Sequence, residues 1–264
     1  MRIVLHILAV VLLTFLTQIG GVVYLVALIA IKRTTPRRRL KRLGVFVVLY
    51  LLATFLLVPW IAPLFGREPI KGSPNLEPHT YFYKLANRNY VTPALQVLLQ
   101  EVATNFAQQH PGLQVHYLDA NFPFFDGFPL LPHLSHKDGK KIDVCLVYED
   151  ANGQLSNLRP SVSGYGIYEG PRPNEYDQTA VCKKKGYWPY DFPKYLSLGH
   201  VHKELRFSER GTRDLALAIL KEPRLQKLFI EPHLKARLRL THNKVRFHGC
   251  HAVRHDDHIH LQVP

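Results

Sequence analysis

Two long apolar runs open the chain, and a short basic segment separates them. Residues 3–31 and residues 45–65 contain no charged side chain. A helix needs about 20 apolar residues to cross the hydrocarbon core of a bilayer, so each run is long enough to span a membrane. The segment between them, KRTTPRRRLKR, holds seven basic residues. This pattern predicts a hairpin of two transmembrane helices over residues 1–66, with the basic segment as its loop.

Other interpretations of the two runs fit less well. The first run is about twice as long as the apolar part of a signal peptide, and no small-residue cleavage site follows it before Lys32. Helices in the core of a soluble protein seldom reach 29 residues without a charge. Pro59 and Pro63 mark the end of the second helix, where Trp60 suits the membrane interface.

The basic loop predicts the orientation of the hairpin. Basic residues in short loops remain in the cytoplasm, and only Arg2 and the amino terminus oppose this loop from the other side. We therefore expect a cytoplasmic loop that can contact anionic lipid headgroups, with both termini outside. The remaining 198 residues would lie in the periplasm, anchored to the inner membrane.

The distribution of charge argues against nucleic acid as a partner. The chain has 34 Lys and Arg, 20 Asp and Glu, and a net charge of +14. All 20 acidic residues follow residue 66, whereas eight of the basic residues precede it. The remaining 26 basic and 20 acidic residues give residues 67–264 a net charge of only +6. The excess of positive charge therefore belongs to the membrane segment, and we expect no nucleic-acid partner.

The exported part divides into two predicted regions. Residues 67–91 mix Gly, Pro, Ser and Asn without a regular period, which indicates a linker or a wrap-around arm. Residues 92–264 form the predicted domain. Its first helix begins with Thr92 as the N-cap and Pro93 as the first residue, and the triplet His-Pro-Gly that starts at His110 ends it.

Short strands alternate with helices in the rest of this domain. Residues 149–200 are crowded with Gly, Pro, Asn and Tyr and are expected to form a loop-like insertion. Helices interleaved with a few short strands indicate an α+β fold. The expected strands cover residues 113–117, 142–148, 228–230 and 258–263, and the expected further helices cover residues 211–221 and 233–240.

Histidine gathers at the end of the chain, in the segment HDDHIH. His258 and His260 are two residues apart, so in a strand both side chains point to one face. Ile259 and Leu261 then point to the other face, into the core. The pair is suited to metal binding, and a partly exposed strand face is the alternative.

A second cluster lies in the segment HLSHKDGKKID. Asp143 opens an apolar strand, where a carboxylate is costly unless it is paired or bound to a metal. If this strand neighbours the last one, Asp143 and His260 can meet at one point, and His136 supplies a third ligand. Three protein ligands and a water are typical of a catalytic zinc site. A salt bridge between Asp143 and a basic residue is the alternative.

These segments resemble a known family. PHLSHKDGKKID resembles the H-x-S-H-x-x-G-x-x-x-D motif of the penicillin-insensitive murein endopeptidases, and VRHDDHIHLQV resembles their closing H-x-x-H-x-H segment. KLFIEPHLKARL resembles the segment that precedes this closing motif. The resemblance covers roughly residues 131–263. It implies a zinc peptidase of the lysostaphin and D-Ala-D-Ala metallopeptidase group, with a small antiparallel sheet and flanking helices.

The resemblance also implies a role for each residue. The zinc ligands would be His136, Asp143 and His260, and His258 would be the catalytic histidine. The auxiliary residues, near the metal or the substrate, would be His133 and His255.

The function implied is a membrane-anchored zinc peptidase that hydrolyses peptide bonds of peptidoglycan. A D,D- or L,D-carboxypeptidase of the same zinc family is a close alternative. From another class, the domain could be a cell-wall-binding module that keeps the fold without activity. The expected partners are peptidoglycan and the inner membrane.

The chain has three cysteines, which is too few for a disulfide scaffold. In an oxidising envelope one disulfide can form, and three pairings are possible. We favour Cys182–Cys250, which leaves Cys145 buried on its strand as an apolar filler.

Overall fold

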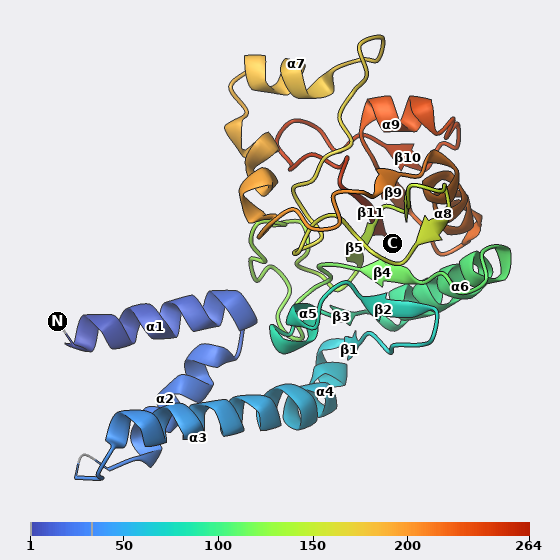
Figure 1. Cartoon of the computed structure of the whole chain (residues 1–264). Coiled ribbons are helices and arrows are strands. Elements are labelled where there is room, and N and C mark those ends of the chain that lie inside the picture. The colour runs from blue at the N-terminus through green and yellow to red at the C-terminus, as the bar shows by residue number, and fades with distance from the viewer. Residues whose placement is uncertain (1, 33) are drawn as a thin grey trace.

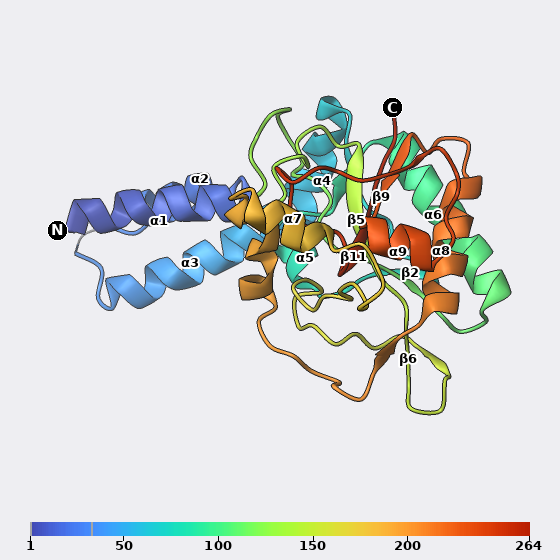
Figure 2. The same cartoon turned by 90° about the horizontal axis from the view of Figure 1, so that it is seen from above.

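The structure, a computed structural model, describes residues 2–32 and 34–264. A group of N-terminal helices projects from one side of a folded unit that contains all the strands described (Figures 1 and 2). This unit combines small sheets with helices, which confirms the α+β prediction.

The first apolar run is not a single helix. Helix α1 (Arg2–Thr17) ends at a turn, and helix α2 (Gly20–Ala30) folds back against it. Gln18 has a positive φ of 66° in this turn. A Cβ atom at Gly21 would lie 2.0 Å from the hydroxyl oxygen of Thr14, so only glycine permits this close packing. The prediction that residues 3–31 form one membrane-spanning helix is therefore wrong for the fold described.

The second apolar run does form a continuous helical stretch. Within residues 2–32 and 34–264, one stretch, Arg38–Phe65, is long and apolar enough to cross a membrane. It comprises α3 (Arg38–Leu52), the π-helical turn η1 (Ala53–Leu57), α4 (Val58–Ile61) and the 3₁₀ turn η2 (Ala62–Phe65). Gly66 follows with a φ of 70° and ends the stretch, close to the position predicted from the prolines.

A six-stranded sheet forms the centre of the folded unit, in the order β10-β9-β11-β5-β4-β2. The sheet is mixed, which corrects the expectation of an antiparallel sheet. The inner pairs are antiparallel, whereas the edge pairs β10/β9 and β2/β4 are parallel. Parallel neighbours need a crossover, and helices α6 and α9 lie in those two connections. The strands are β2 (Leu76–Pro78), β4 (Val115–Tyr117), β5 (Lys141–Cys145), β9 (Lys227–Phe229), β10 (Val245–Arg246) and β11 (His258–Gln262).

Two helices and one face of the sheet build the main core. Helix α6 (Pro93–Gln109) begins as predicted, although the hydroxyl of Thr92 makes no capping hydrogen bond. Helix α8 (Glu209–Lys221) is capped by Ser208, which precedes its first residue. The side chain of Ser208 accepts a hydrogen bond from the Gly211 amide. Helix α9 (Pro232–Arg237) is shorter than expected. One continuous core contains Leu95, Leu99 and Val102 of α6, Leu215 and Ile219 of α8, and the strand residues Ile142, Val144, Ile259 and Leu261.

Residues 67–91 are integrated into the folded unit. They provide β2 of the main sheet, helix α5 (Phe82–Leu85) and the paired strands β1 (Glu68–Pro69) and β3 (Tyr90–Val91). Four of their side chains, those of Ile70, Leu76, Tyr83 and Val91, are buried in the main core. Of the two interpretations, these contacts favour an arm over a linker.

The insertion is more ordered than its composition indicates. Its flanks pair in a small sheet of β6 (Tyr148–Glu149), β7 (Leu155–Ser156) and β8 (Arg206–Phe207). Helix α7 (Gln178–Lys184) and the 3₁₀ segment η3 (Trp188–Leu196) follow one another within it. A disulfide joins Cys182 to Cys250, and Cys145 is free and buried, as predicted.

The disulfide yields a first testable prediction. Cys250→Ser should lower the free energy of unfolding by about 2–4 kcal/mol, because the unfolded chain regains the entropy that the link removes. Urea unfolding of the detergent-solubilised full chain measures the difference. Cys145→Ala, which leaves the link intact, should change the free energy less. Equal stability of Cys250→Ser and the parent chain, or three free thiols by intact mass, would contradict the assignment.

Candidate metal centre

Three side chains from two strands and one loop converge on one point. In the antiparallel pair β11/β5, His260 lies directly opposite Asp143. The Nδ1 atom of His260 is 2.9 Å from Oδ1 of Asp143 and 3.0 Å from Nε2 of His136. The third side of this triangle, from His136 Nε2 to Asp143 Oδ1, is 3.3 Å. The strand pairing predicted from sequence therefore brings the three proposed ligands together.

The triangle has nearly the size that a metal ion requires. In a tetrahedral zinc site with bonds of about 2.0–2.2 Å, neighbouring ligand atoms lie about 3.3–3.6 Å apart. The observed separations of 2.9–3.3 Å need only a small expansion to match. The three side chains are buried, with at most 1% of their surface exposed.

The hydrogen bonds of His136 orient it as a ligand. Its Nδ1 atom lies 2.7 Å from the carbonyl oxygen of Ala120. A carbonyl can only accept, so Nδ1 carries the proton and the lone pair of Nε2 faces His260 and Asp143. His136 is therefore held in the tautomer that binds a metal through Nε2.

A second group of donors surrounds the other oxygen of Asp143. His133 Nδ1 and His258 Nε2 lie 3.6 and 3.7 Å from Oδ2. His258 Nδ1 is hydrogen-bonded to Asp257, which leaves its Nε2 buried without a partner among the described residues. His133 Nδ1 lies 3.0 Å from Oδ2 of Asp119. The predicted catalytic and auxiliary histidines thus border the carboxylate of the predicted ligand.

The two histidines of the last strand differ in their electrostatic environment. Burial lowers the pKa of His260 to about 3, although Asp143 opposes this effect. Burial also lowers the pKa of His258, but Asp143 and Asp257 outweigh it and raise the pKa to about 9. For Asp143, the desolvation that would raise its pKa is outweighed by His136, His258 and His133, which hold the pKa well below its usual value. Around neutral pH the His260 ring is therefore uncharged and has a lone pair available for a metal ion. The His258 ring is protonated and can act as a proton donor.

His255 lies at the border of the cluster. Its ring centre is 4.8 Å from that of His258 and 5.5 Å from that of His260. Its backbone amide donates to Glu231, which follows strand β9 in the segment KLFIEPHLKARL. That segment therefore supports the final strand from the neighbouring position in the sheet. His248, which sequence reasoning missed, packs beside His255 at 5.4 Å between ring centres.

Tyr165 of the insertion covers the cluster. Its hydroxyl donates to Oδ2 of Asp143 at 2.8 Å, and its ring centre lies 4.6 Å from His133 and 5.1 Å from His258. The next residue, Gly166, has a φ of 81°, and a Cβ there would lie 2.4 Å from a backbone oxygen. Glycine at this position therefore lets the segment that carries Tyr165 pack closely against the backbone of Pro193 in η3.

Several partners of the cluster come from segments that carry no motif. Arg88 of the arm makes a two-point ion pair with Asp119, with contacts of 2.6 and 2.7 Å, and Asp119 in turn holds His133. The Gly166 amide donates to Asp257 at 2.6 Å, so the insertion and His258 share one carboxylate. An Asp in an apolar segment, such as Asp119, indicates in the sequence that a buried partner is needed. Which residue is the partner cannot be predicted, because the partners are distant along the chain.

No family model matches the chain, and no curated protein matches it significantly. The function of the cluster is therefore inferred from its geometry. Within residues 2–32 and 34–264, two groups of three residues could hold a metal ion, and they share Asp143. The group of His136, Asp143 and His260 is the tighter, since its donor atoms lie within 3.3 Å of one another.

Tyr165 provides a second testable prediction. Tyr165→Phe removes the hydrogen bond that fixes the free oxygen of Asp143, and loss of such an outer partner weakens metal affinity by about 10–100-fold. Competition with a zinc chelator on the purified protein measures the affinity. The matched control is Tyr168→Phe, because the Tyr168 hydroxyl is buried without a partner among the described residues and its ring stacks on Arg254. Equal affinities of Tyr165→Phe and the control would contradict the positioning role.

Proposed function

We propose that the protein is a membrane-anchored zinc peptidase that hydrolyses peptide bonds of peptidoglycan. The observation that carries this proposal is the triangle of His136 Nε2, Asp143 Oδ1 and His260 Nδ1. Two imidazole nitrogens and one carboxylate oxygen are a ligand type used by catalytic zinc peptidases. A set of three protein ligands leaves a position open for substrate, unlike the four ligands of structural sites.

Each surrounding side chain has a defined task in this mechanism. Bound zinc would supply a Lewis acid that polarises a peptide carbonyl and lowers the pKa of a coordinated water to about 7. Asp257 holds His258 through Nδ1, so that Nε2 can donate a hydrogen bond to the developing oxyanion or a proton to the leaving amine. Asp119 holds His133 beside it, which limits the rotation of both rings.

The cysteine on the same strand takes no part in the chemistry. Cys145 is buried, and desolvation raises the pKa of its thiol to about 11. A thiol that remains protonated is neither a nucleophile nor a good metal ligand. The proposed reaction therefore uses no covalent enzyme intermediate.

Burial of the cluster favours one alternative within the same zinc family. The six residues proposed for the site are at most 4% exposed, and Tyr165 contacts three of them, Asp143, His133 and His258. A free peptide end enters a covered site more easily than the middle of a cross-link, which favours a D,D- or L,D-carboxypeptidase. Mass analysis of digested sacculi distinguishes the two: an endopeptidase converts cross-linked dimers into monomers, whereas a carboxypeptidase shortens stems by one residue.

The complete donor set argues against the third candidate, an inactive cell-wall-binding module. His136 and His260 meet one oxygen of Asp143, and His258 lies 3.7 Å from the other oxygen. The anchor fits a periplasmic domain at the inner membrane, since Arg38–Phe65 can cross the bilayer with the basic loop in the cytoplasm.

The histidine pair provides a third testable prediction. Both His260→Ala and His258→Ala should abolish cleavage of purified sacculi, but for different reasons. Loss of a ligand should weaken zinc binding by more than the roughly 10–100-fold typical of an outer partner. Loss of His258 should leave the metal in place and reduce the rate by about 10²–10³-fold, as for a lost oxyanion donor. Elemental analysis of bound zinc, together with muropeptide release, separates the two effects.

The exposed His242 offers a matched control for these variants, because His242→Ala should change neither readout. A chelator should stop cleavage by the parent chain, and added zinc should restore it. Loss of zinc in His258→Ala with retention in His260→Ala would reverse the assignment. Full activity of both variants would reject the zinc-peptidase proposal.

A further inference from the structure

The N-terminal helices expose an extensive apolar surface, which is unfavourable in contact with water. Large aliphatic side chains point outward along all of α1, α2 and α3, and Ile29 and Leu64 are each 83% exposed. Soluble proteins rarely expose apolar patches of this extent. Residues 1–66 also contain no acidic residue. A partner for this surface must therefore be apolar over its whole length, with negative charge near the basic end.

Polar side chains within the first run are satisfied inside the hairpin or by the folded unit. His6 Nδ1 and the Tyr24 hydroxyl are 2.8 Å apart, which links α1 to α2. The hydroxyls of Thr14 and Thr17 donate to carbonyl oxygens one turn earlier, both at 2.7 Å. In the hydrocarbon core of a bilayer there is no water to form hydrogen bonds, so polar groups must pair within the protein. The contacts of the hairpin meet this requirement.

The tip of the hairpin is fixed against the folded unit. The side-chain nitrogen of Gln18 donates to the backbone carbonyl of Phe124 at 3.1 Å. Its side-chain oxygen accepts a hydrogen bond from the backbone amide of Phe124 at 2.9 Å. At the far end, Arg42 of α3 donates to the carbonyl of Leu28 near the end of α2, at 2.6 Å. Figures 1 and 2 show that the N-terminal end of α1 and the connection between α2 and α3 both lie far from the folded unit.

Helix lengths differ between the hairpin and the third helical stretch. At 1.5 Å per residue, the 16 residues of α1 extend about 24 Å and the 11 residues of α2 about 16 Å, against a hydrocarbon core of roughly 30 Å. A bilayer accommodates helices shorter than its core by local thinning. The 28 residues of Arg38–Phe65 extend about 42 Å by the same rise, enough to cross the bilayer and its interfaces. Helix α2 packs against α3, so a bilayer around the longer stretch would also surround the hairpin.

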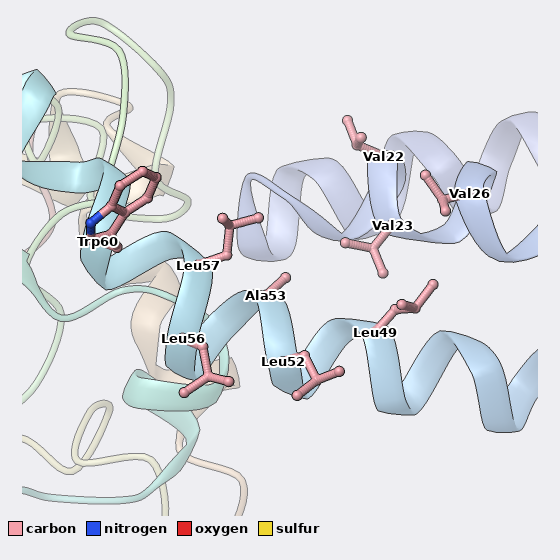
Figure 3. Close-up of a pocket in the computed structure, with 9 residues that line it drawn as sticks. All are labelled: Val22, Val23, Val26, Leu49, Leu52, Ala53, Leu56, Leu57 and Trp60. Atoms are coloured by element: carbon pink, nitrogen blue, oxygen red, sulfur yellow. The ribbon is translucent and has the colours of Figure 1, made fainter.

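A groove between α2 and the stretch Arg38–Phe65 has an apolar lining that suits lipid acyl chains. Its volume is about 650 Å³, and Figure 3 shows its walls, which carry no charged side chain. The π-helical turn η1 provides Ala53, Leu56 and Leu57 of this wall. A second apolar groove shares several of these residues and reaches Phe124 and Phe125 of the folded unit.

We propose that the α1–α2 hairpin is embedded in the same bilayer as α3, its outer face and groove covered by lipid acyl chains. The N-terminus then lies on the same side as the basic loop, and the Gln18 turn lies on the side of the folded unit. This inference rests on the proposed membrane anchoring and changes its topology. All eight basic residues of the first 66 gather on the cytoplasmic side with none opposing them, as the positive-inside rule favours.

Cysteine labelling from the two sides of the membrane tests the topology. Single cysteines replace Ile3, Thr35 and Lys71 in the full chain carrying Cys145→Ala, with the native disulfide retained. Spheroplasts and inverted vesicles are treated with a membrane-impermeant maleimide. Ile3→Cys and Thr35→Cys should react only in inverted vesicles, and Lys71→Cys, on the exposed arm, only in spheroplasts.

Reaction of Ile3→Cys in spheroplasts would overturn the proposal, as would its protection from both sides. Cross-linking of a His6→Cys, Tyr24→Cys pair with a flexible, membrane-permeant bismaleimide provides a second measurement, because the centres of the His6 and Tyr24 rings are 6.0 Å apart. An uncross-linked pair would reject the hairpin. Muropeptide release is independent of these readouts, so an inactive protein with the expected labelling would reject only the peptidase. Labelling of Thr35→Cys from outside would instead reject the proposed anchoring.

Discussion

The structure depends on a carboxylate buried in the middle of its main sheet. Asp143 has no exposed surface, and an isolated charge at such a position would destabilise the fold by several kcal/mol. Tyr165 donates to one of its oxygens, and His136 and His260 lie around the other. A metal ion would add positive charge at the oxygen beside His136 and His260, whereas His258 lies beside the other oxygen. The surrounding histidines are thus at once the stabilising environment of Asp143 and the donors of the proposed site.

The position of the site follows from the two faces of the sheet. Ile259 and Leu261 bind the last strand to the core beneath α6 and α8, which fixes His258 and His260 on the opposite face. The insertion then crosses that face, and the disulfide from α7 to Cys250 ties it to the segment before the last strand. Tyr165 of the insertion contacts Asp143 on that face, and the six residues of the proposed site are at most 4% exposed.

Local patterns predicted the elements that present the donors, and non-local contacts decided the rest. Strict alternation in β11 and the costly Asp143 in β5 were enough to predict that the two strands place their polar residues together. Tyr165 could not be predicted, since its contact with Asp143 depends on the path of a loop-like insertion with no regular period. The break in the first apolar run could not be predicted because glycine is common in membrane helices. Only the packing of Gly21 against Thr14 and of Gly20 against Thr17 shows why glycine is needed there.

The proposed function requires that His136, Asp143 and His260 bind one zinc ion. X-ray absorption spectroscopy of the purified full chain tests it most directly, because the spectrum reports the element and its ligands without any assumption about the substrate. We predict one zinc per chain with a shell of nitrogen and oxygen at about 2.0–2.2 Å, and with the signature of two imidazole rings. A sulfur shell at about 2.3 Å, or a chain that retains no metal after purification in zinc-containing buffer, would contradict the account.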